Sequence, residues 1–219
     1  MSNRSTIRVR HELRFRLLDV VGAERVTPHL IRITLGGEQL VGFTSLGFDD
    51  HVKVFAPRAG EFLDRLPEMG PEGPVFGVGG PQPAMRDYTP HDFDPVSRTL
   101  QLDFALHDAG PVTAWARRAG EGDKLVIGGP RSSFVVGMGF HWHLLIGDET
   151  ALPAIRRRLA ELPQGSRAVV LAEAEDPEDE EPFVSGADVE AHWAFRARAP
   201  GGAPSCLAQA LAAVHLLVL

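Results

Sequence analysis

The sequence predicts a six-stranded antiparallel β-barrel followed by an α/β domain with a parallel sheet. In the first part of the chain, short apolar runs with period-two alternation are separated by glycine and proline. The 23 glycines and 17 prolines are spread over the whole chain, which favours turns and short strands over disorder. After about residue 139, strand patterns alternate with helix patterns, as in a parallel sheet. We therefore expect two domains, residues 1–138 and 139–219.

The expected elements follow from these patterns in chain order. Barrel strands are predicted at residues 15–21, 30–35, 52–55, 100–106 and 124–128. The α/β domain is predicted to contain strands at 143–146, 168–172 and 189–195 and helices at 151–162 and 207–213. Residues 173–181 include seven acidic side chains, which predicts a solvated loop that is too charged to be buried.

Composition restricts the kinds of partner. The net charge of −7 argues against a general nucleic-acid surface, so an anionic ligand would need a local basic pocket. The single cysteine, Cys206, excludes an intrachain disulfide and suits a reducing compartment. Residues 1–16 lack the apolar stretch of a signal peptide, and no later run reaches membrane-spanning length. We expect a soluble cytoplasmic protein without a membrane partner, either a monomer or a homodimer.

The segment Arg86-Asp87-Tyr88-Thr89-Pro90 carries groups that suit a flavin. An arginine offers a forked cation for phosphate, a tyrosine ring can stack on the isoalloxazine, and the threonine can bond the ring edge. The alternative is a plain turn at the edge of a sheet.

Two further segments combine a glycine with the start of a helix. Around residues 107–116, a glycine turn enters a short helix that could receive a pyrophosphate, or could be an ordinary capped helix with Trp115 in the core. Around residues 147–154, a strand ends in a turn that opens a helix, which is where a dinucleotide binds in an open α/β sheet. The residues concerned are His107, Gly110, Pro111, Val112, Thr113 and Trp115 in the first segment, and Gly147, Asp148, Glu149, Thr150, Ala151 and Pro153 in the second.

These motifs, in this order, resemble those of the siderophore-interacting proteins, which are flavin-dependent ferric-siderophore reductases related to ferredoxin reductases. The resemblance runs from about Phe15 to His215. Its motifs are Arg86-x-Tyr88-Thr89-Pro90, His107-x-x-Gly110-Pro111-x-x-x-Trp115-Ala116, Gly128-Gly129-Pro130-Arg131-x-Ser133, and Gly147-Asp148-Glu149-Thr150-Ala151-Leu152-Pro153-Ala154.

The resemblance implies a role for each motif. Residues 86–89 would hold the flavin head, residues 107–115 would hold the pyrophosphate and adenosine side of FAD, and residues 147–153 would border the nicotinamide dinucleotide. Lys53 and Arg131 are similar to the basic residues that hold the anionic ferric siderophore, although each is equally well explained as a surface cation. His91 stands where the family usually has arginine. The family also continues beyond Leu219, so we expect the α/β domain to lack its last elements.

The resemblance therefore implies FAD-dependent reduction of ferric siderophores by NAD(P)H, with release of Fe(II) in the cytoplasm, no catalytic acid or base and no protein-bound metal. The donor stays open, because Glu173 and Glu175 after a strand favour a ribose hydroxyl, whereas the resemblance implies NADPH rather than NADH. One alternative is a flavin- or siderophore-binding protein with little NAD(P)H turnover, reduced by an external donor such as a ferredoxin. Another is a non-functional product whose second domain is marginally folded.

Overall fold

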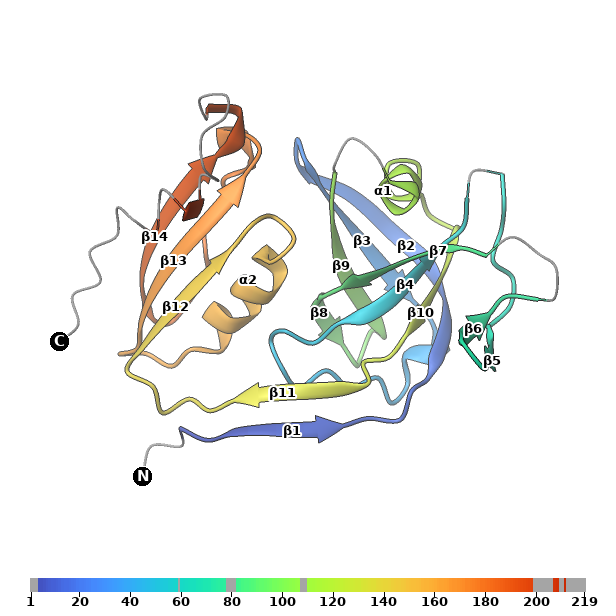
Figure 1. Cartoon of the computed structure of the whole chain (residues 1–219), viewed down its shortest axis with the longest axis horizontal. Coiled ribbons are helices and arrows are strands. Elements are labelled where there is room, and N and C mark those ends of the chain that lie inside the picture. The colour runs from blue at the N-terminus through green and yellow to red at the C-terminus, as the bar shows by residue number, and fades with distance from the viewer. Residues whose placement is uncertain are drawn as a thin grey trace. The chain divides into compact units, whose positions relative to one another are not determined.

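The computed structural model describes residues 4–58, 60–77, 82–106, 110–198, 207, 208 and 211 (Figure 1). Contacts divide the chain into two compact units, which we treat separately. The barrel unit consists of residues 7–26 and 30–135, and the α/β unit consists of residues 1–6, 27–29 and 136–219.

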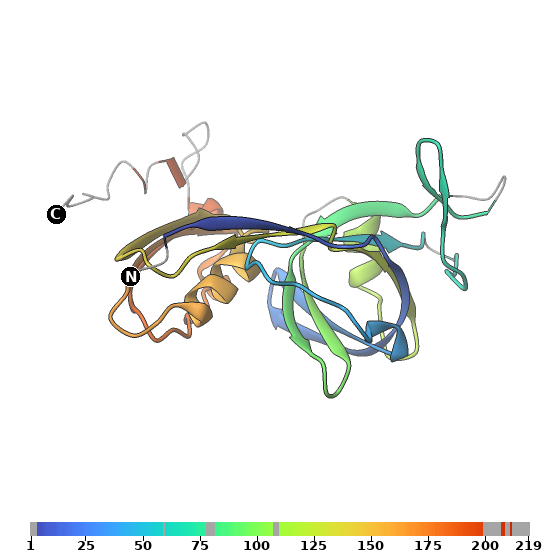
Figure 2. The same cartoon turned by 90° about the horizontal axis from the view of Figure 1, so that it is seen from below.

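The barrel unit is built on an antiparallel sheet of seven strands in the order β7-β4-β10-β2-β3-β9-β8. Figure 2 shows how strongly this sheet curls. Its strands are β2 (Phe15–Thr27), β3 (Leu30–Gly36), β4 (Val52–Ala56), β7 (Ala84–Tyr88), β8 (Pro90–Asp94), β9 (Thr99–Ala105) and β10 (Lys124–Gly128). The predicted fold class, an antiparallel barrel before a parallel sheet, is confirmed.

The sheet has seven strands because one extended segment, residues 84–94, contributes two of them. Residues 84–88 pair with β4, whereas residues 90–94 pair with β9 at the other edge of the sheet. The segment changes partner at Thr89, and it is therefore two strands where the sequence pattern indicates at most one. Because the two edges are joined by continuous chain, this short segment bridges the open side of the sheet.

Four shorter strands were not predicted. β1 (Thr6–Arg10) pairs with β11 (Ser132–Val136), and β5 (Glu68–Gly70) pairs with β6 (Gly73–Val75). β5 and β6 have only three residues each, β1 is almost entirely exposed, and β11 has no apolar alternation, so none carries the extended period-two pattern that identifies the predicted strands.

The barrel core consists of the inward residues of each strand. Leu18, Ile33, Val54, Leu102 and Ile127 are completely buried, each on a different strand. Helix α1 (Pro111–Ala116) and the short helix η1 (Glu38–Leu40) contribute further apolar side chains to this core. A buried leucine or isoleucine stabilises a fold by about 1.5–3 kcal/mol, so the hydrophobic effect supplies the main stabilisation here.

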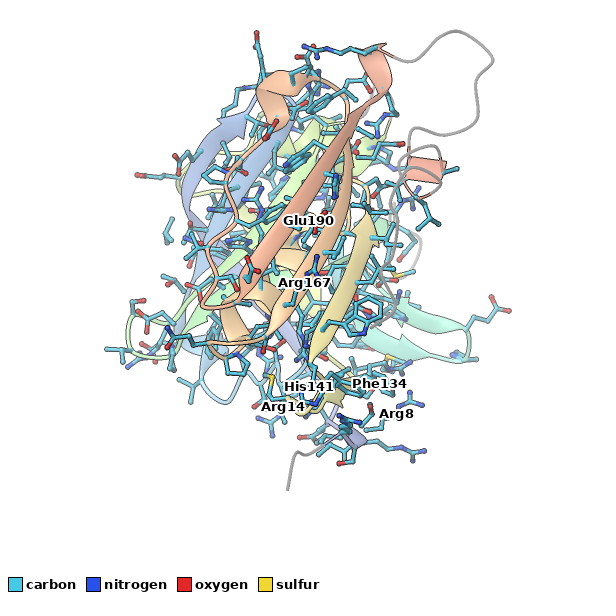
Figure 3. All side chains as sticks on the ribbon, turned by 90° about the vertical axis from the view of Figure 1, so that its left-hand side faces the viewer. Arg8, Arg14, Phe134, His141, Arg167 and Glu190 are labelled. Atoms are coloured by element: carbon cyan, nitrogen blue, oxygen red, sulfur yellow. The ribbon has the colours of Figure 1, made fainter. Side chains whose placement is uncertain are left out.

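The α/β unit contains a parallel three-stranded sheet in the order β12-β13-β14 and one packed helix. The elements are β12 (Trp142–Gly147), α2 (Leu152–Glu161), β13 (Arg167–Ala174), η2 (Pro177–Asp179), β14 (Asp188–Phe195) and η3 (Arg196–Arg198). Figure 3 labels Arg167 on β13 and Glu190 on β14, which form an ion pair of 2.9 Å between the adjacent strands. Of the helix predicted at 207–213, Leu207, Ala208 and Leu211 are helical, and the other residues lie outside the described ones.

The acidic run, residues 173–181, begins within β13 and is partly buried, which corrects the prediction of a solvated loop. Glu173 is 7% exposed because Arg196 and the amide of Leu207 bind its carboxylate. Asp179 is 6% exposed, and its carboxylate accepts hydrogen bonds from the side chains of Thr27 and His29, which belong to the same unit. Paired carboxylates can be buried, whereas unpaired ones cannot. In the described part of the chain, no helix has the length and apolar character needed to span a membrane.

A buried polar network joins three separate segments of the barrel unit. Asp50 is 3% exposed, and its carboxylate accepts hydrogen bonds from the Ser133 hydroxyl at 2.6 Å and the Gly47 amide at 3.1 Å. The Ser133 oxygen also lies 2.7 Å from His11 Nε2 and accepts from the Leu46 amide at 3.1 Å. Since Ser133 has one proton and gives it to Asp50, His11 Nε2 must be the donor to Ser133.

We predict that Ser133→Ala lowers the free energy of unfolding by about 2 kcal/mol, because it leaves the buried Asp50 carboxylate and the Leu46 amide each without one partner. Urea denaturation measures this loss. Ser132→Ala is the control, since this neighbouring residue is less buried, and we expect a change within about 0.5 kcal/mol. Equal effects of the two substitutions would contradict a stabilising role for the network.

Candidate functional site

The flavin motif lies on β7, with its alternate residues on opposite faces of the sheet. Arg86 and Tyr88 pair with Val54 and Val52 of β4, so they lie on the face of β7 that is directed toward the barrel core. The Tyr88 ring packs on Phe104 with a centroid distance of 4.3 Å. Burial raises the pKa of Tyr88 to about 12, against a smaller lowering by the charge of Arg86, so the hydroxyl stays protonated at neutral pH.

The opposite face of β7 carries Asp87, whose carboxylate accepts two hydrogen bonds from Lys53 Nζ at 2.8 and 3.1 Å. Lys53 lies on β4, and it lines a cavity of about 250 Å³ together with Arg131. The two residues proposed for siderophore binding from the resemblance are therefore brought to one cavity. The other lining residues are Leu13, Phe15, His51, Phe55, Met69, Glu72, Gly73, Pro74, Met85 and Gly128.

This cavity, which we call the Lys53 cavity, has an apolar wall that none of the sequence motifs indicates. Phe15 and Phe55 pack edge to face at 5.9 Å, and Met85 lies beside them in the lining. A period-two pattern was the available signal, since Phe55 and Lys53 lie on one face of β4 and Met85 pairs directly with Phe55. A cavity that combines cations with an aromatic wall can contact the anionic and apolar parts of a ligand.

His91 belongs to a cluster of ionisable groups rather than to the Arg86 face. Its Nδ1 lies 3.2 Å from Asp103 Oδ2, and the same carboxylate accepts two hydrogen bonds from Arg32 at 2.7 and 2.9 Å. Burial alone would raise the pKa of Asp103, but the hydrogen bonds from Arg32 and His91 and their charges outweigh it and lower the pKa to about 2. His91 therefore lies within ion-pair distance of Asp103. Thr89, at the junction of β7 and β8, is half-buried.

We predict that Asp103→Asn lowers the free energy of unfolding by about 2 kcal/mol at neutral pH. Because the folded pKa lies below the unfolded one, the carboxylate stabilises the fold fully above about pH 4, and this contribution is lost as the pH falls toward 2. Urea denaturation from pH 7 to pH 3 should show the difference between the two proteins shrinking. Asp92→Asn, an exposed carboxylate on the neighbouring strand, is the control, and a constant difference for Asp103→Asn would contradict the assignment.

Helix α1 contributes mainly to the core. Trp115 is 2% exposed and lies 5.7 Å from Phe104, and Val112 and Thr113 are also buried. Their side chains therefore pack inside the barrel unit, and the binding role given to Val112 and Trp115 would have to come from their backbone. Pro111 is exposed and Gly110 is half-buried at the start of the helix. His107 lies outside the described residues.

In the α/β unit, the predicted dinucleotide turn joins β12 to α2. A Cβ atom at Gly147 would lie 2.3 Å from the Cβ of Ala151, so only glycine allows this close approach. The Asp148 carboxylate accepts hydrogen bonds from the Thr150 amide at 2.9 Å and the Thr150 hydroxyl at 2.5 Å. Pro153 is buried in the first turn of α2. The turn therefore has a defined conformation at the carboxyl end of a parallel strand, where dinucleotides bind.

Arg196 holds the acidic side chains of this region. Its guanidinium donates hydrogen bonds to Glu149 at 2.5 and 2.8 Å, to Glu173 at 3.2 Å and to Glu175 at 3.0 Å. The hydrogen bonds to Glu149, followed by those to the other carboxylates, raise the pKa of Arg196, which stays charged. Glu173 and Glu175, interpreted from the sequence as possible ribose ligands, are both engaged in this cluster.

Comparison with known families agrees with this geometry. Residues 19–134 match the siderophore-interacting FAD-binding domain, and residues 140–217 match the siderophore-interacting protein domain. The chain belongs to the siderophore-interacting protein family. Its barrel unit therefore includes an FAD-binding domain, as the motifs predicted.

Individual relatives support the assignment. An NADPH-dependent ferric-chelate reductase of Escherichia coli is 45% identical over 155 residues, which are 71% of this chain and 60% of that protein. The ferric vibriobactin reductase of Vibrio cholerae is 32% identical over 197 residues, which are 90% of this chain and 71% of that protein. The crystal structure of a siderophore utilization protein from T. fusca superposes with a TM-score of 0.82 at 34% identity, covering 96% of this chain and 80% of that one.

Proposed function

We propose that this protein reduces ferric siderophores, with FAD as the bound cofactor and NAD(P)H as the electron donor. The observation that carries the proposal is the Lys53 cavity, in which Lys53 and Arg131 meet beside an aromatic wall in the unit that matches an FAD-binding domain. Ferric siderophores are commonly anionic, so the two cations of this cavity would bind them. The names of the E. coli and V. cholerae relatives support the same reaction type.

The residues of the barrel unit fit an FAD. Arg86 is exposed on the face of β7 that it shares with the half-buried Tyr88, so a phosphate-binding cation and an aromatic ring are presented together. We assign Arg86, Tyr88 and Thr89 to the flavin and the start of α1, at Gly110 and Pro111, to its pyrophosphate. When bound, FAD would accept a hydride from NAD(P)H and pass electrons singly to Fe(III).

The role of the protein is to hold the two substrates rather than to transfer protons. Residues 147–153 would border the dinucleotide at the carboxyl end of β12. Lys53 and Arg131 would hold the ferric siderophore, and the protonated Tyr88 would add no negative charge beside the flavin. Reduction weakens the binding of iron by the hard oxygen ligands of the siderophore, so Fe(II) would be released, in our proposal within the cytoplasm.

Anaerobic stopped-flow absorbance tests this function on the full chain saturated with FAD. We expect NADPH or NADH to bleach the flavin band and a ferric siderophore to restore it. If dithionite bleaches the flavin but neither nucleotide does, the NAD(P)H step fails and an external donor takes its place. If the chain binds no FAD, the proposal is wrong as a whole.

We predict that Lys53→Gln and Arg131→Gln each raise the siderophore concentration for half-maximal flavin reoxidation by about tenfold, because each removes one charge-assisted contact to the anion. The reoxidation phase of the same stopped-flow trace gives this value. Lys124→Gln is the matched control, since Lys124 also pairs with a carboxylate, Asp19, across two strands but lies outside the Lys53 cavity. A similar increase in the control would indicate a general charge effect.

We also predict that Arg86→Gln weakens FAD binding by about tenfold or more, through loss of a forked contact to phosphate. Titration of the apoprotein with FAD, followed by flavin fluorescence, measures the dissociation constant. Arg65→Gln removes an exposed arginine from the same unit and should leave the constant within about twofold. An unchanged constant in Arg86→Gln would remove this residue from the flavin site.

A further inference from the structure

A second cavity of the barrel unit collects positive charge on side chains that have no role assigned above, although its lining residues Gly129 and Pro130 lie between Gly128 and Arg131 of the Lys53 cavity in the chain. It has a volume of about 430 Å³, and we call it the Arg16 cavity. Its lining consists of Arg10, His11, Glu12, Arg14, Arg16, Gly42, Thr44, Gly129 and Pro130. None of these residues lines the Lys53 cavity, and none belongs to the flavin or dinucleotide motifs.

Arg16 is the unusual member of this set. It is 5% exposed, and its guanidinium donates to the carbonyl oxygens of Gln39 at 2.9 Å, Gly129 at 3.1 Å and Arg14 at 3.4 Å. Its cation also lies 5.3 Å from the centre of the Phe43 ring. All of these partners are neutral groups, and no carboxylate among the described residues forms an ion pair with Arg16. A buried charge is expensive unless an opposite charge compensates it.

The neighbouring charges increase the imbalance. Three guanidinium groups line the cavity, and the single carboxylate, Glu12, is bound by Arg14 at 2.7 Å. The cavity lining therefore carries two more positive charges than negative ones. Burial, and then the like charge of Arg14, lower the pKa of Arg16, as expected for a buried cation without a carboxylate partner.

The wall of the cavity is held in place by the buried network described above. His11 lines the cavity and donates through Nε2 to Ser133, which in turn donates to the buried carboxylate of Asp50. On the other side, Gly42 has a φ of 74°, and a Cβ atom there would lie 3.9 Å from Arg14 Nη1. The positive φ would strain any other residue at this position, whereas 3.9 Å is an ordinary van der Waals contact with the guanidinium.

We propose that the Arg16 cavity binds a dianionic oxyanion, either a phosphate group or a dicarboxylate, through Arg14, whose Nε and Nη2 would exchange Glu12 for the ligand, and through the charge of Arg16. A dianion matches the two excess charges, and carboxylate and phosphate are the groups that arginine binds with two parallel hydrogen bonds. The inference is independent of the proposed reductase function, because it rests on residues that the reaction does not use.

Isothermal titration calorimetry of the full chain tests the site, with sodium phosphate in one arm and sodium succinate in the other. The buffer contains neither anion, and sodium chloride keeps the ionic strength constant. We expect one-to-one saturable binding in at least one arm, and the arm that saturates identifies the chemical source of the oxyanion. Arg14→Gln should weaken that binding about tenfold or more. Arg16→Lys should weaken it while retaining the charge, because an ammonium has fewer donors than the guanidinium, whose Nε and Nη1 already bind carbonyl oxygens.

Arg8→Gln is the matched control. Arg8 is exposed on β1 and lies two residues before Arg10, which lines the cavity, but Arg8 itself is not part of the lining. Figure 3 labels both Arg8 and Arg14. We expect this variant to bind within about twofold of the wild type. Equal weakening of binding in Arg8→Gln and Arg14→Gln would mean that only surface charge attracts the anion, and it would overturn the proposal. Binding heats that do not saturate with either phosphate or succinate would also overturn it.

Repeating the titration with FAD-saturated protein separates this site from the flavin site. Binding that persists with FAD present supports a distinct cavity. Binding that disappears would assign the Arg16 cavity to the flavin and overturn the proposal of a separate site. Circular dichroism of each variant excludes loss of fold as the cause of weaker binding.

Discussion

The barrel unit depends on the pairing of one short segment, residues 84–94, with both edges of its sheet. Because β7 pairs with β4 in a single register, Arg86 and Tyr88 are directed to one side and Asp87 to the other. The same register places Asp87 beside Lys53 and Met85 beside Phe55. The proposed flavin face and the Lys53 cavity thus lie on opposite faces of the β4–β7 pair. Shifting the register of β7 by one residue would exchange the side chains on these two faces.

Five of the seven strands of the curled sheet could be predicted because apolar residues alternate along them. Strands β7 and β8, which carry the flavin motif, were not predicted, because their polar residues hide the alternation. The convergence of Lys53 and Arg131 on one cavity was only suggested by resemblance, since the two lie far apart in the chain. Burial of Glu173 and Asp179 was not predictable from composition, because it depends on partners, Arg196 and His29, that are distant in sequence. The strands β1, β5 and β6 carry too few apolar residues to be recognised.

Charge in this protein is organised locally. The chain has a net charge of −7, yet cations line two cavities of the barrel unit, where Lys53 and Arg16 are the central members. In the α/β unit the reverse holds, since one guanidinium, that of Arg196, binds three carboxylates. Net charge therefore says little about what each part of the surface attracts, and the pairing of individual groups determines the local potential.

The contact between Gly147 and Ala151 has a consequence for how this protein can change over evolution. With a hypothetical Cβ at residue 147 only 2.3 Å from that of Ala151, the two positions share the space of a single methyl group. Any larger residue at position 147 must be matched by glycine at position 151 or by movement of the backbone at the start of α2. The two sites are therefore coupled in their tolerance of substitution, and their combined effects should depart from additivity.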